Sequence, residues 1–251
     1  MAIILRKPDE IAKLKRAGEI VGHTLQYLQN LVKPGMTLLE IDALGEAYIR
    51  EKGAIPSFKG LYGFTGSVCT SLNAVCIHGV PDNTVIKEGD ILGLDIGTKL
   101  DGYFGDAAIT MAVGKVSKED EALIACAKGS LYHAIESIYA GMRFKELTQV
   151  LENYIVDAGF VPLRDYCGHG IGTKPHSEPN IPNYLEGKAN QGPKIKNGMV
   201  FCLEPMVCQK SGTPMLLEDG WSVLSDDRLK SSHYEHQVAI VDGKAIILTQ
   251  V

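Results

Sequence analysis

The sequence predicts an α+β protein built from two similar halves, at about residues 1–112 and 113–251, within one domain spanning residues 1–251. Apolar residues recur at helical spacing in two separate stretches of the chain. Alternating apolar runs around an Asp-Gly pair follow each stretch, as in antiparallel hairpins. The same marker residues also recur in the same order in both halves. We therefore expect a pair of helices followed by antiparallel strands, twice.

The first half opens with two predicted helices. Pro8 begins a run in which apolar residues recur every three or four positions. Thr37 and Glu40 form a Thr-x-x-Glu capping box, in which each side chain can bond the backbone N–H of the other residue. They therefore mark the start of a second helix, which we expect to end near residues 52–53.

The second half repeats this plan. Ser117 and Asp120 give a weaker capping signal before another run with helical spacing. After the segment AGMRFKEL, a further helix is predicted to run through Leu151 to Gly159.

Two blocks of matching residues indicate an internal duplication. In the first block every offset is 106, and the pairs are Gly35 with Gly141, Met36 with Met142, Glu40 with Glu146, Gly53 with Gly159, and Pro56 with Pro162. In the second, KEGDILGLD (87–95) matches KNGMVFCLE (196–204) with an offset of 109, so Asp95 falls on Glu204. Two unrelated helix pairs that use the same caps would also produce such matches. A true duplication predicts one site to which both halves contribute matching residues.

The segment around Asp101 and Gly102 reads as a β-hairpin, because an Asp-Gly pair between alternating runs is a strong turn signal. If these two residues form the turn, Asp95 lies opposite Ala108. Asp106 then shares the face of Asp95 as its diagonal neighbour, roughly 7 Å away at the backbone.

Two further carboxylates lie in apolar strands of the second half. Glu204 stands in MVFCLEPM, at the position that the repeat equates with Asp95. Glu235 precedes the hairpin that turns at residues 242–243, and we expect it to play the part of Asp106. A solvent-exposed hairpin face would explain one carboxylate. Four on apolar strands require cations, because buried carboxylates must be paired, protonated or bound to metal.

The segment CGHGIGTKPHSEPNIP (167–182) contains His169 and His176, whose spacing alone does not show whether they share a role. A single histidine in a glycine-rich loop is more often structural. Added to four carboxylates, one imidazole completes an oxygen-rich site that suits a pair of ions such as Mn, Fe, Co or Zn. Paired ions lie about 3.5–4 Å apart and can share a bridging water.

The composition excludes several other classes. The net charge is -5 and no basic run is present, which argues against nucleic acid as the partner. No apolar stretch reaches the length of a membrane span. Six scattered cysteines without a CxxC pair indicate reduced thiols in a cytoplasmic protein.

Over nearly its whole length the sequence resembles the type I methionine aminopeptidases of bacterial style. The resemblance rests on the motifs VCIHGVP, LDIG…DGYFGD, GHGIG…PHSEP, CLEPMV and YEHQVAIV. It implies the pita-bread fold, a pseudo-twofold pair of helix-helix-sheet halves around a curved antiparallel sheet, as a single catalytic domain. It also implies removal of the N-terminal initiator methionine from nascent proteins whose second residue is small.

The resemblance further implies a set of site residues. Two divalent metal ions, drawn from Co, Mn, Fe, Zn and Ni, would be bound by Asp95, Asp106, His169, Glu204 and Glu235. Glu204 would also serve as general base and acid. His78 would contact the scissile amide nitrogen or the substrate backbone, and His176 the scissile carbonyl. The methionine side chain would bind among Phe58, Leu61, Phe64, Cys69, Pro175 and Trp221. Plain alternatives remain: a turn histidine, a surface-loop histidine and a tryptophan in ordinary core packing.

The sequence departs from the family pattern at four positions without losing a ligand: Ala74, Ala107, Pro175 and Ser177. We expect these departures to affect the hydrogen bonds behind the ligands and the shape of the pocket.

Two other hypotheses compete. One is a sister enzyme that cleaves before proline, although such peptidases usually carry an additional N-terminal domain. The other is a non-catalytic relative that binds a partner, whose signature would be missing ligands. The family implies a monomer with a transient contact at the ribosome exit region and no membrane partner. The short interval between Glu204 and Glu235 leaves no room for the helical insert of type II enzymes.

Overall fold

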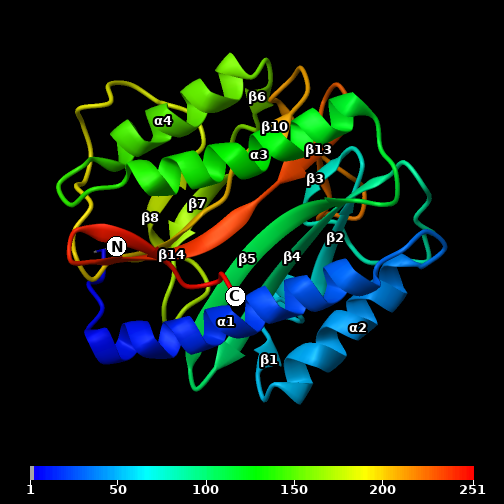
Figure 1. Ribbon diagram of the computed structural model, residues 1–251, viewed down its shortest axis with the longest axis horizontal. Helices are drawn as coiled ribbons and strands as arrows, with labels where there is room; N and C mark the ends of the chain where they lie inside the picture. Colours follow the sequence, from blue (N-terminus) through cyan, green and yellow to red (C-terminus); the bar gives the residue numbers. More distant parts are fainter. Residues whose placement is uncertain (1–2) are drawn as a thin grey trace.

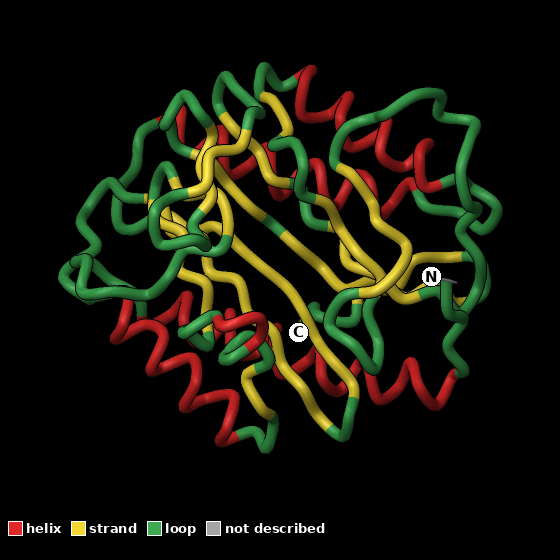
Figure 2. The backbone as a smooth tube through the Cα atoms, turned by 180° about the vertical axis from the view of Figure 1, so that it is seen from behind, coloured by secondary structure: helices red, strands yellow, loops and turns green. Residues whose placement is uncertain are grey.

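The computed structural model describes residues 3–251 and contains a curved antiparallel sheet with two pairs of helices on one face. The helices are α1 (Pro8–Leu31), α2 (Leu38–Glu51), α3 (Lys118–Ser137) and α4 (Phe144–Asp157), with a short 3-10 turn η1 (Leu61–Gly63). Figure 1 shows the helices on the near side of the sheet, and Figure 2, from behind, shows the strands in front of them. The predicted α+β class is confirmed.

The large sheet has the order β1-β4-β5-β14-β9-β7-β8, with β2 beside β4 and β15 beside β14. Its strands are β1 (Ile55–Pro56), β2 (Val68–Leu72), β4 (Ile91–Leu100), β5 (Tyr103–Ala112), β7 (Cys167–Gly170), β8 (Ser177–Pro182), β9 (Val200–Leu203), β14 (Glu235–Val241) and β15 (Lys244–Ile247). The two middle strands, β5 and β14, come from different halves of the chain, so the sheet joins the halves at its centre.

Two small sheets, β13-β10-β6 and β11-β12-β3, complete the fold. Their strands are β3 (Val75–Ile77), β6 (Val161–Pro162), β10 (Met206–Cys208), β11 (Pro214–Leu216), β12 (Val223–Ser225) and β13 (Ser231–His233). Within residues 3–251, no helix combines the length and the apolar character needed to cross a bilayer.

The predicted helix starts are confirmed. Pro8 is the first residue of α1. Before α2, Thr37 Oγ1 accepts the Glu40 N–H at 3.1 Å, and the Thr37 N–H donates to the Glu40 carboxylate at 2.7 Å. Ser117 and Asp120 form the same reciprocal pair before α3. These caps satisfy backbone donors that no helical bond can reach.

The predicted hairpin register is also confirmed. Asp95 pairs with Ala108, and the ladder between β4 and β5 continues to the turn without a bulge. Asp101 and Gly102 both have positive φ, 50° and 84°, as a two-residue hairpin turn of type I′ requires. Asp106 therefore lies on the same face as Asp95, two residues along from its cross-strand partner.

Matched backbone contacts support the predicted duplication. Each pair of helices is tied to its sheet by equivalent bonds, which are Gly35 N–H to Ile86 O with Gly141 N–H to Ile195 O, Ile86 N–H to Met36 O with Ile195 N–H to Met142 O, and the bridges Thr37–Val85 with Arg143–Lys194. The offsets are again 106 and 109. The second helix of each pair is therefore anchored in the same way in both halves.

The apolar core lies between helices and sheet, in one cluster for each helix pair. Leu94 and Ile96 on β4 and Ala107 on β5 belong to the cluster under α1 and α2. Because side chains alternate along a strand, Asp95 and Asp106 project from the opposite face. Burial of one face against helices thus directs the carboxylates to the other.

Candidate metal centre

A cavity of about 330 Å³ opens on the face of the sheet that the helices leave uncovered. Its ionisable lining is His78, Asp95, Asp106, Asp165, Tyr166, Cys167, His169, His176, Glu204 and Glu235, together with Tyr62 and Cys69. Its remaining lining is Phe58, Leu61, Phe64, Ile77, Met206 and Trp221. The cavity therefore joins a charged floor to an apolar pocket, and it brings together every predicted site residue except Pro175.

The register of the strands explains how four carboxylates meet. Asp95 and Glu235 both pair with Ala108, from opposite sides of β5. The β14–β9 register, extended by one residue, sets Glu204 opposite Glu235. Asp106 lies two residues along β5 from Ala108, on the same face of the sheet. Neighbouring strands of a sheet lie about 4.8 Å apart, so the side chains of one row project into a common space.

A second row of side chains lies two residues further along the strands, on the same face. It contains Asp106 and the possible nitrogen and sulfur ligands. Cys202 pairs with Gln237. The β7–β9 register, extended by one residue, places His169 beside Cys202. The β5–β14 register, extended likewise, places Asp106 beside Gln237. Asp106, Gln237, Cys202 and His169 thus lie side by side on the cavity face.

His169 is held with one ring nitrogen toward the carboxylates. Its Nδ1 lies 3.2 Å from the Gly170 carbonyl oxygen, to which it can donate. Its Nε2 lies 3.5 Å from Glu204 Oε1 and 4.0 Å from Asp106 Oδ2. Burial, reinforced by His176, lowers the pKa of His169 to about 3. The ring is therefore neutral near pH 7 and presents a lone pair, as a metal ligand must.

The carboxylates lack the partners that buried charges need. Four buried oxygens make no hydrogen bond: Asp95 Oδ1, Asp106 Oδ1, Glu204 Oε1 and Glu235 Oε1. Burial raises the pKa of Asp95 to about 7. Burial first, and then the neighbouring carboxylates, raise the pKa of Asp106, Glu204 and Glu235 well above the usual range. Bound cations would remove this penalty, so the donor set fits divalent metal.

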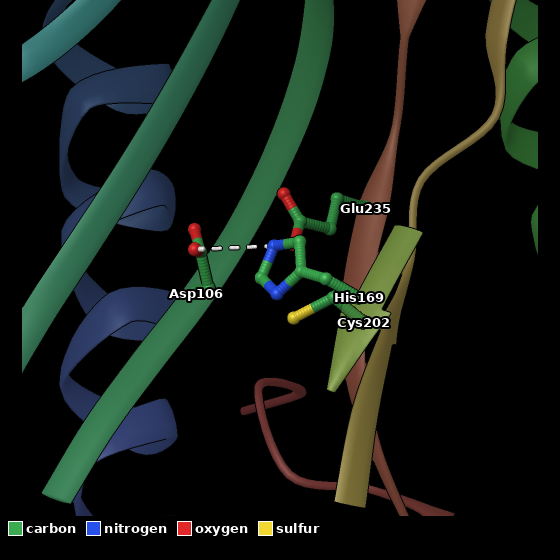
Figure 3. A group of neighbouring side chains, drawn as sticks. All are labelled: Asp106, His169, Cys202 and Glu235. Atoms are coloured by element: carbon green, nitrogen blue, oxygen red, sulfur yellow. Dashed lines mark ion pairs between the residues drawn. The ribbon is translucent and has the colours of Figure 1, made fainter. Parts of the chain in front are cut away.

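Cys202 is a member of this cluster that was expected from the sequence only as one of six reduced thiols. One ligand atom each from Asp106, His169, Cys202 and Glu235 lies within 4.8 Å of the other three (Figure 3). The signal was available, because Cys202 precedes Glu204 by two residues and strand alternation puts both on one face.

The two remaining histidines line the cavity beside the carboxylates. The His176 ring lies 4.5 Å from the His169 ring, between centroids, and 6.4 Å from Tyr62. His78, at a positive φ of 57°, packs edge-on against Tyr166 at 5.8 Å. Burial lowers the pKa of His78 to about 4 and also lowers that of His176. Both are neutral near pH 7, and each ring can donate one N–H.

The apolar end of the cavity contains the five other predicted pocket residues. Phe58, Phe64 and Cys69 form a buried cluster against which Leu61 and Trp221 pack. The rings of Phe64 and Trp221 meet edge to face at 5.1 Å. Four further lining residues were not predicted from the sequence, because they lie in a 3-10 turn, a loop and short strands without a regular pattern: Tyr62, Ile77, Tyr166 and Met206.

The four departures from the family pattern lie at different distances from the site. Pro175 is not among the residues that line the cavity. Ala107 is fully buried under α1 and α2, so it faces away from the ligands. Ala74 lies in the turn between β2 and β3, where its carbonyl accepts from Ser231. Ser177 begins β8 and pairs with Gly170, next to His169.

The chain is similar to known metallopeptidases along almost its whole length. A sequence model of metallopeptidase family M24 matches residues 12–242. The methionine aminopeptidase of Helicobacter pylori (strain J99) is 58% identical over 252 residues, covering 100% of both chains.

Solved structures agree with this match. The crystal structure of methionine aminopeptidase from Thermotoga maritima superposes with a TM-score of 0.97 at 33% identity and covers 100% of both chains. Prolidase from Pyrococcus furiosus superposes with a TM-score of 0.78 at 22% identity, covering 99% of this chain and 66% of the prolidase. The predicted pita-bread fold is therefore confirmed.

Proposed function

The chain belongs to metallopeptidase family M24, and from this premise we propose that it is a methionine aminopeptidase. It removes the N-terminal initiator methionine from nascent proteins and prefers a small second residue. One observation carries this proposal: unpartnered carboxylate oxygens from both halves face His169 at the floor of a cavity whose other end is apolar. An exopeptidase for methionine needs both parts in one cavity.

The charged floor would hold two divalent ions. Their ligands would be Asp95, Asp106, His169, Glu204 and Glu235, and the native ions would come from Co, Mn, Fe, Zn and Ni. Such ions polarise a carbonyl and activate water near neutral pH. Four carboxylates from two halves of the sheet would balance the charge of two divalent cations.

Three side chains of the chain would handle the substrate's polar atoms. Glu204, as general base, takes a proton from the attacking water and passes it to the leaving amine. His176 donates to the scissile carbonyl oxygen as negative charge develops there. His78 contacts the scissile amide nitrogen or the substrate backbone.

The apolar end would bind the methionine side chain. Phe58, Leu61, Phe64, Cys69 and Trp221 offer aromatic edges and a thiol to a thioether. Sulfur–aromatic contacts contribute about 0.3–1.5 kcal/mol each, which favours methionine over an isosteric alkyl chain.

The assay compares tripeptides on the metal-loaded protein. Release of free methionine from Met-Ala-Ser is expected with at least one of Co, Mn, Fe, Ni or Zn, and Met-Leu-Ser should be much poorer. Ala-Pro peptides test the proline-directed alternative. Failure to release methionine with every metal, or preference for Ala-Pro, would overturn the proposal. Fewer than one bound ion per chain would favour a non-catalytic relative.

We further propose that residues 1–251 act as one catalytic domain and as a cytoplasmic monomer that meets the ribosome exit region transiently. The free thiols of Cys69, Cys76, Cys126, Cys167, Cys202 and Cys208 support a reducing compartment. Sedimentation in the metal-loaded state tests the monomer, and cosedimentation with translating ribosomes tests the contact.

A further inference from the structure

The thiol of Cys202 lies among the donor atoms of the proposed metal centre, although Cys202 is not one of the residues that line the cavity. Its Sγ is one of four ligand atoms that all lie within 4.8 Å of one another, with those of Asp106, His169 and Glu235 (Figure 3). The register explains the position, because Cys202 lies between Gln237 and His169 in one row across the sheet. The residue is 0% exposed and also belongs to a buried apolar cluster with Phe104 and Ala239, so its thiol is closed to solvent.

A second observation points to a ligand at this place. Asp106 Oδ1 and Glu235 Oε1 are buried beside the thiol without hydrogen-bond partners. Cys202 and Glu235 also share a side-chain hydrogen bond, in which the thiol is the donor. One hydrogen bond cannot satisfy both carboxylates. A cation among them would contact sulfur, nitrogen and oxygen donors together.

We propose that Cys202 is a sulfur ligand of the metal ion bound by Asp106, His169 and Glu235. Ligation replaces the thiol proton with the metal and releases that proton to solvent. Thiolate is a softer donor than carboxylate, so Cys202 favours Zn, Fe and Co over Mn at this ion. The proposal rests on the proposed metal centre and adds to it a donor outside the five ligands given above.

Cobalt spectroscopy tests the sulfur bond directly. The protein is stripped of metal, reloaded with Co(II) without oxygen, and examined for a near-ultraviolet sulfur-to-cobalt charge-transfer band. Wild type should show the band, and Cys202→Ser should lack it while still binding cobalt. The apparent Kd for Co(II) should rise about 10- to 100-fold in Cys202→Ser, with a smaller change for Mn(II).

Two matched thiol variants serve as controls. Cys126→Ser removes a buried thiol on α3 that does not line the cavity, and Cys69→Ser removes a buried thiol that does line it. Both should keep the band. Loss of the band in Cys69→Ser, or its persistence in Cys202→Ser, would overturn the assignment.

The test also separates this inference from the proposed function. Wild type that binds cobalt and releases methionine but shows no band keeps the function and loses the sulfur ligand. Wild type that binds no metal loses both. If Cys202→Ser does not fold by circular dichroism, X-ray absorption of the zinc-loaded wild type decides. A scatterer at about 2.3 Å supports a Zn–S bond, and a shell of oxygen and nitrogen alone overturns it.

Discussion

The two halves of the chain place their carboxylates in different ways. In residues 3–112, Asp95 and Asp106 lie on neighbouring strands of one tight hairpin. In residues 113–251, Glu204 and Glu235 are separated by residues 205–234, which form β10, β11, β12 and β13. Each half nevertheless contributes two carboxylates to the same cavity. The pairing of the strands in the sheet therefore decides where each carboxylate lies. The length of the segment that connects two strands does not.

The halves also differ in what else they contribute. The nitrogen and sulfur donors of the cluster, His169 and Cys202, both come from the second half. Much of the apolar pocket comes from the first half, as Phe58, Phe64 and Cys69. The two halves thus supply equal numbers of carboxylates but different other groups. Under the proposed function, the first half would bind more of the substrate side chain and the second would supply the softer metal donors.

The largest expected effect tests whether matched carboxylates have equal roles. Glu204→Gln should lower kcat for Met-Ala-Ser by about 10²–10⁴-fold at any metal concentration, because it removes a general base as well as a ligand. Asp95→Asn should lose metal affinity first and recover activity in part when metal is added. Steady-state assays with metal analysis measure both. Equal recovery of the two variants would mean that Glu204 has no role beyond ligation.

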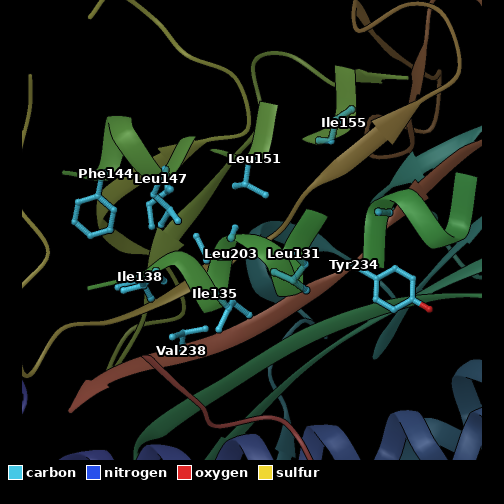
Figure 4. Packing of buried hydrophobic residues seen from close by; sticks show 14 of the residues in the cluster. Leu131, Ile135, Ile138, Phe144, Leu147, Leu151, Ile155, Leu203, Tyr234 and Val238 are labelled. Atoms are coloured by element: carbon cyan, nitrogen blue, oxygen red, sulfur yellow. The ribbon is translucent and has the colours of Figure 1, made fainter. Parts of the chain in front are cut away.

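A second prediction concerns the cores of the two halves. Ile41 on α2 and Leu147 on α4 are separated by the repeat offset of 106. Both are 0% exposed, and Figure 4 shows Leu147 packed in its cluster. Ile41→Ala and Leu147→Ala should each lower the free energy of unfolding by about 2–5 kcal/mol, since each leaves a cavity.

Urea unfolding of the metal-free protein measures the two losses. Leu39→Ala is the control, because Leu39 is 42% exposed and its truncation should cost no more than about 0.5 kcal/mol. A large loss in one half and a negligible loss in the other would show that the second helix pair is not anchored like the first.

A graded effect follows from the raised pKa of Asp95. Without metal, the folded protein keeps a proton on Asp95 up to about pH 7, whereas the unfolded chain releases it near 3.8. The folded state therefore binds more protons in this window, and the stability that Asp95 contributes falls as pH rises through it. Buried His78 acts in the opposite direction, because its pKa is lowered from 6.5 to about 4 and stability is lost as pH falls.

Comparing wild type with Asp95→Asn cancels the histidine contribution. The thermal midpoint of metal-free wild type, relative to the variant, should drop between about pH 4 and about pH 7. Added metal should remove this drop in wild type. A difference between the two proteins that stays constant with pH would contradict the assignment of the titration to Asp95.

The smallest expected effect separates the two helix caps. Thr37→Ala should cost about 1 kcal/mol, because the Thr37 hydroxyl accepts the Glu40 N–H. Arg143, at the matching position of the second half, makes no side-chain cap bond. Its backbone N–H is bound by Glu146, so Arg143→Ala should cost less. Thermal unfolding of both variants measures the difference, and a larger loss from Arg143→Ala would contradict it.

Elements set by local rules were predictable from the sequence. The turn at Asp101 and Gly102 fixed the register of β4 and β5, and the register fixed the shared face of Asp95 and Asp106. Glu235 was expected to match Asp106, and it does lie on the paired central strand. Glu235 pairs with Ala108, however, and not with Asp106, which lies two residues further along β5. This shift of two residues could not be predicted, because β14 follows a long segment and no tight turn fixes its register.

Features that depend on several segments were not predictable. Tyr62 lies in η1 with a positive φ of 50°, and no periodic pattern places it at the cavity. Met206 and Ile77 reach the cavity through the small sheets, whose short strands give weak alternation signals. Strand alternation puts Cys202 on the same face as Glu204, but its apolar context gives no sign of a metal donor.

The contact between α1 and the end of β15 bears on how the chain folds during synthesis. Gly18 and Gly22 on α1 leave no room for a Cβ because the backbone of Leu248 and Thr249 lies against them. Leu248 also bonds the Gln237 backbone, on the strand that carries Glu235. A ribosome makes α1 before Thr249, so this face of α1 stays uncovered until residues 248–249 have been made. The central strand therefore gains this support only after most of the sheet has been synthesised.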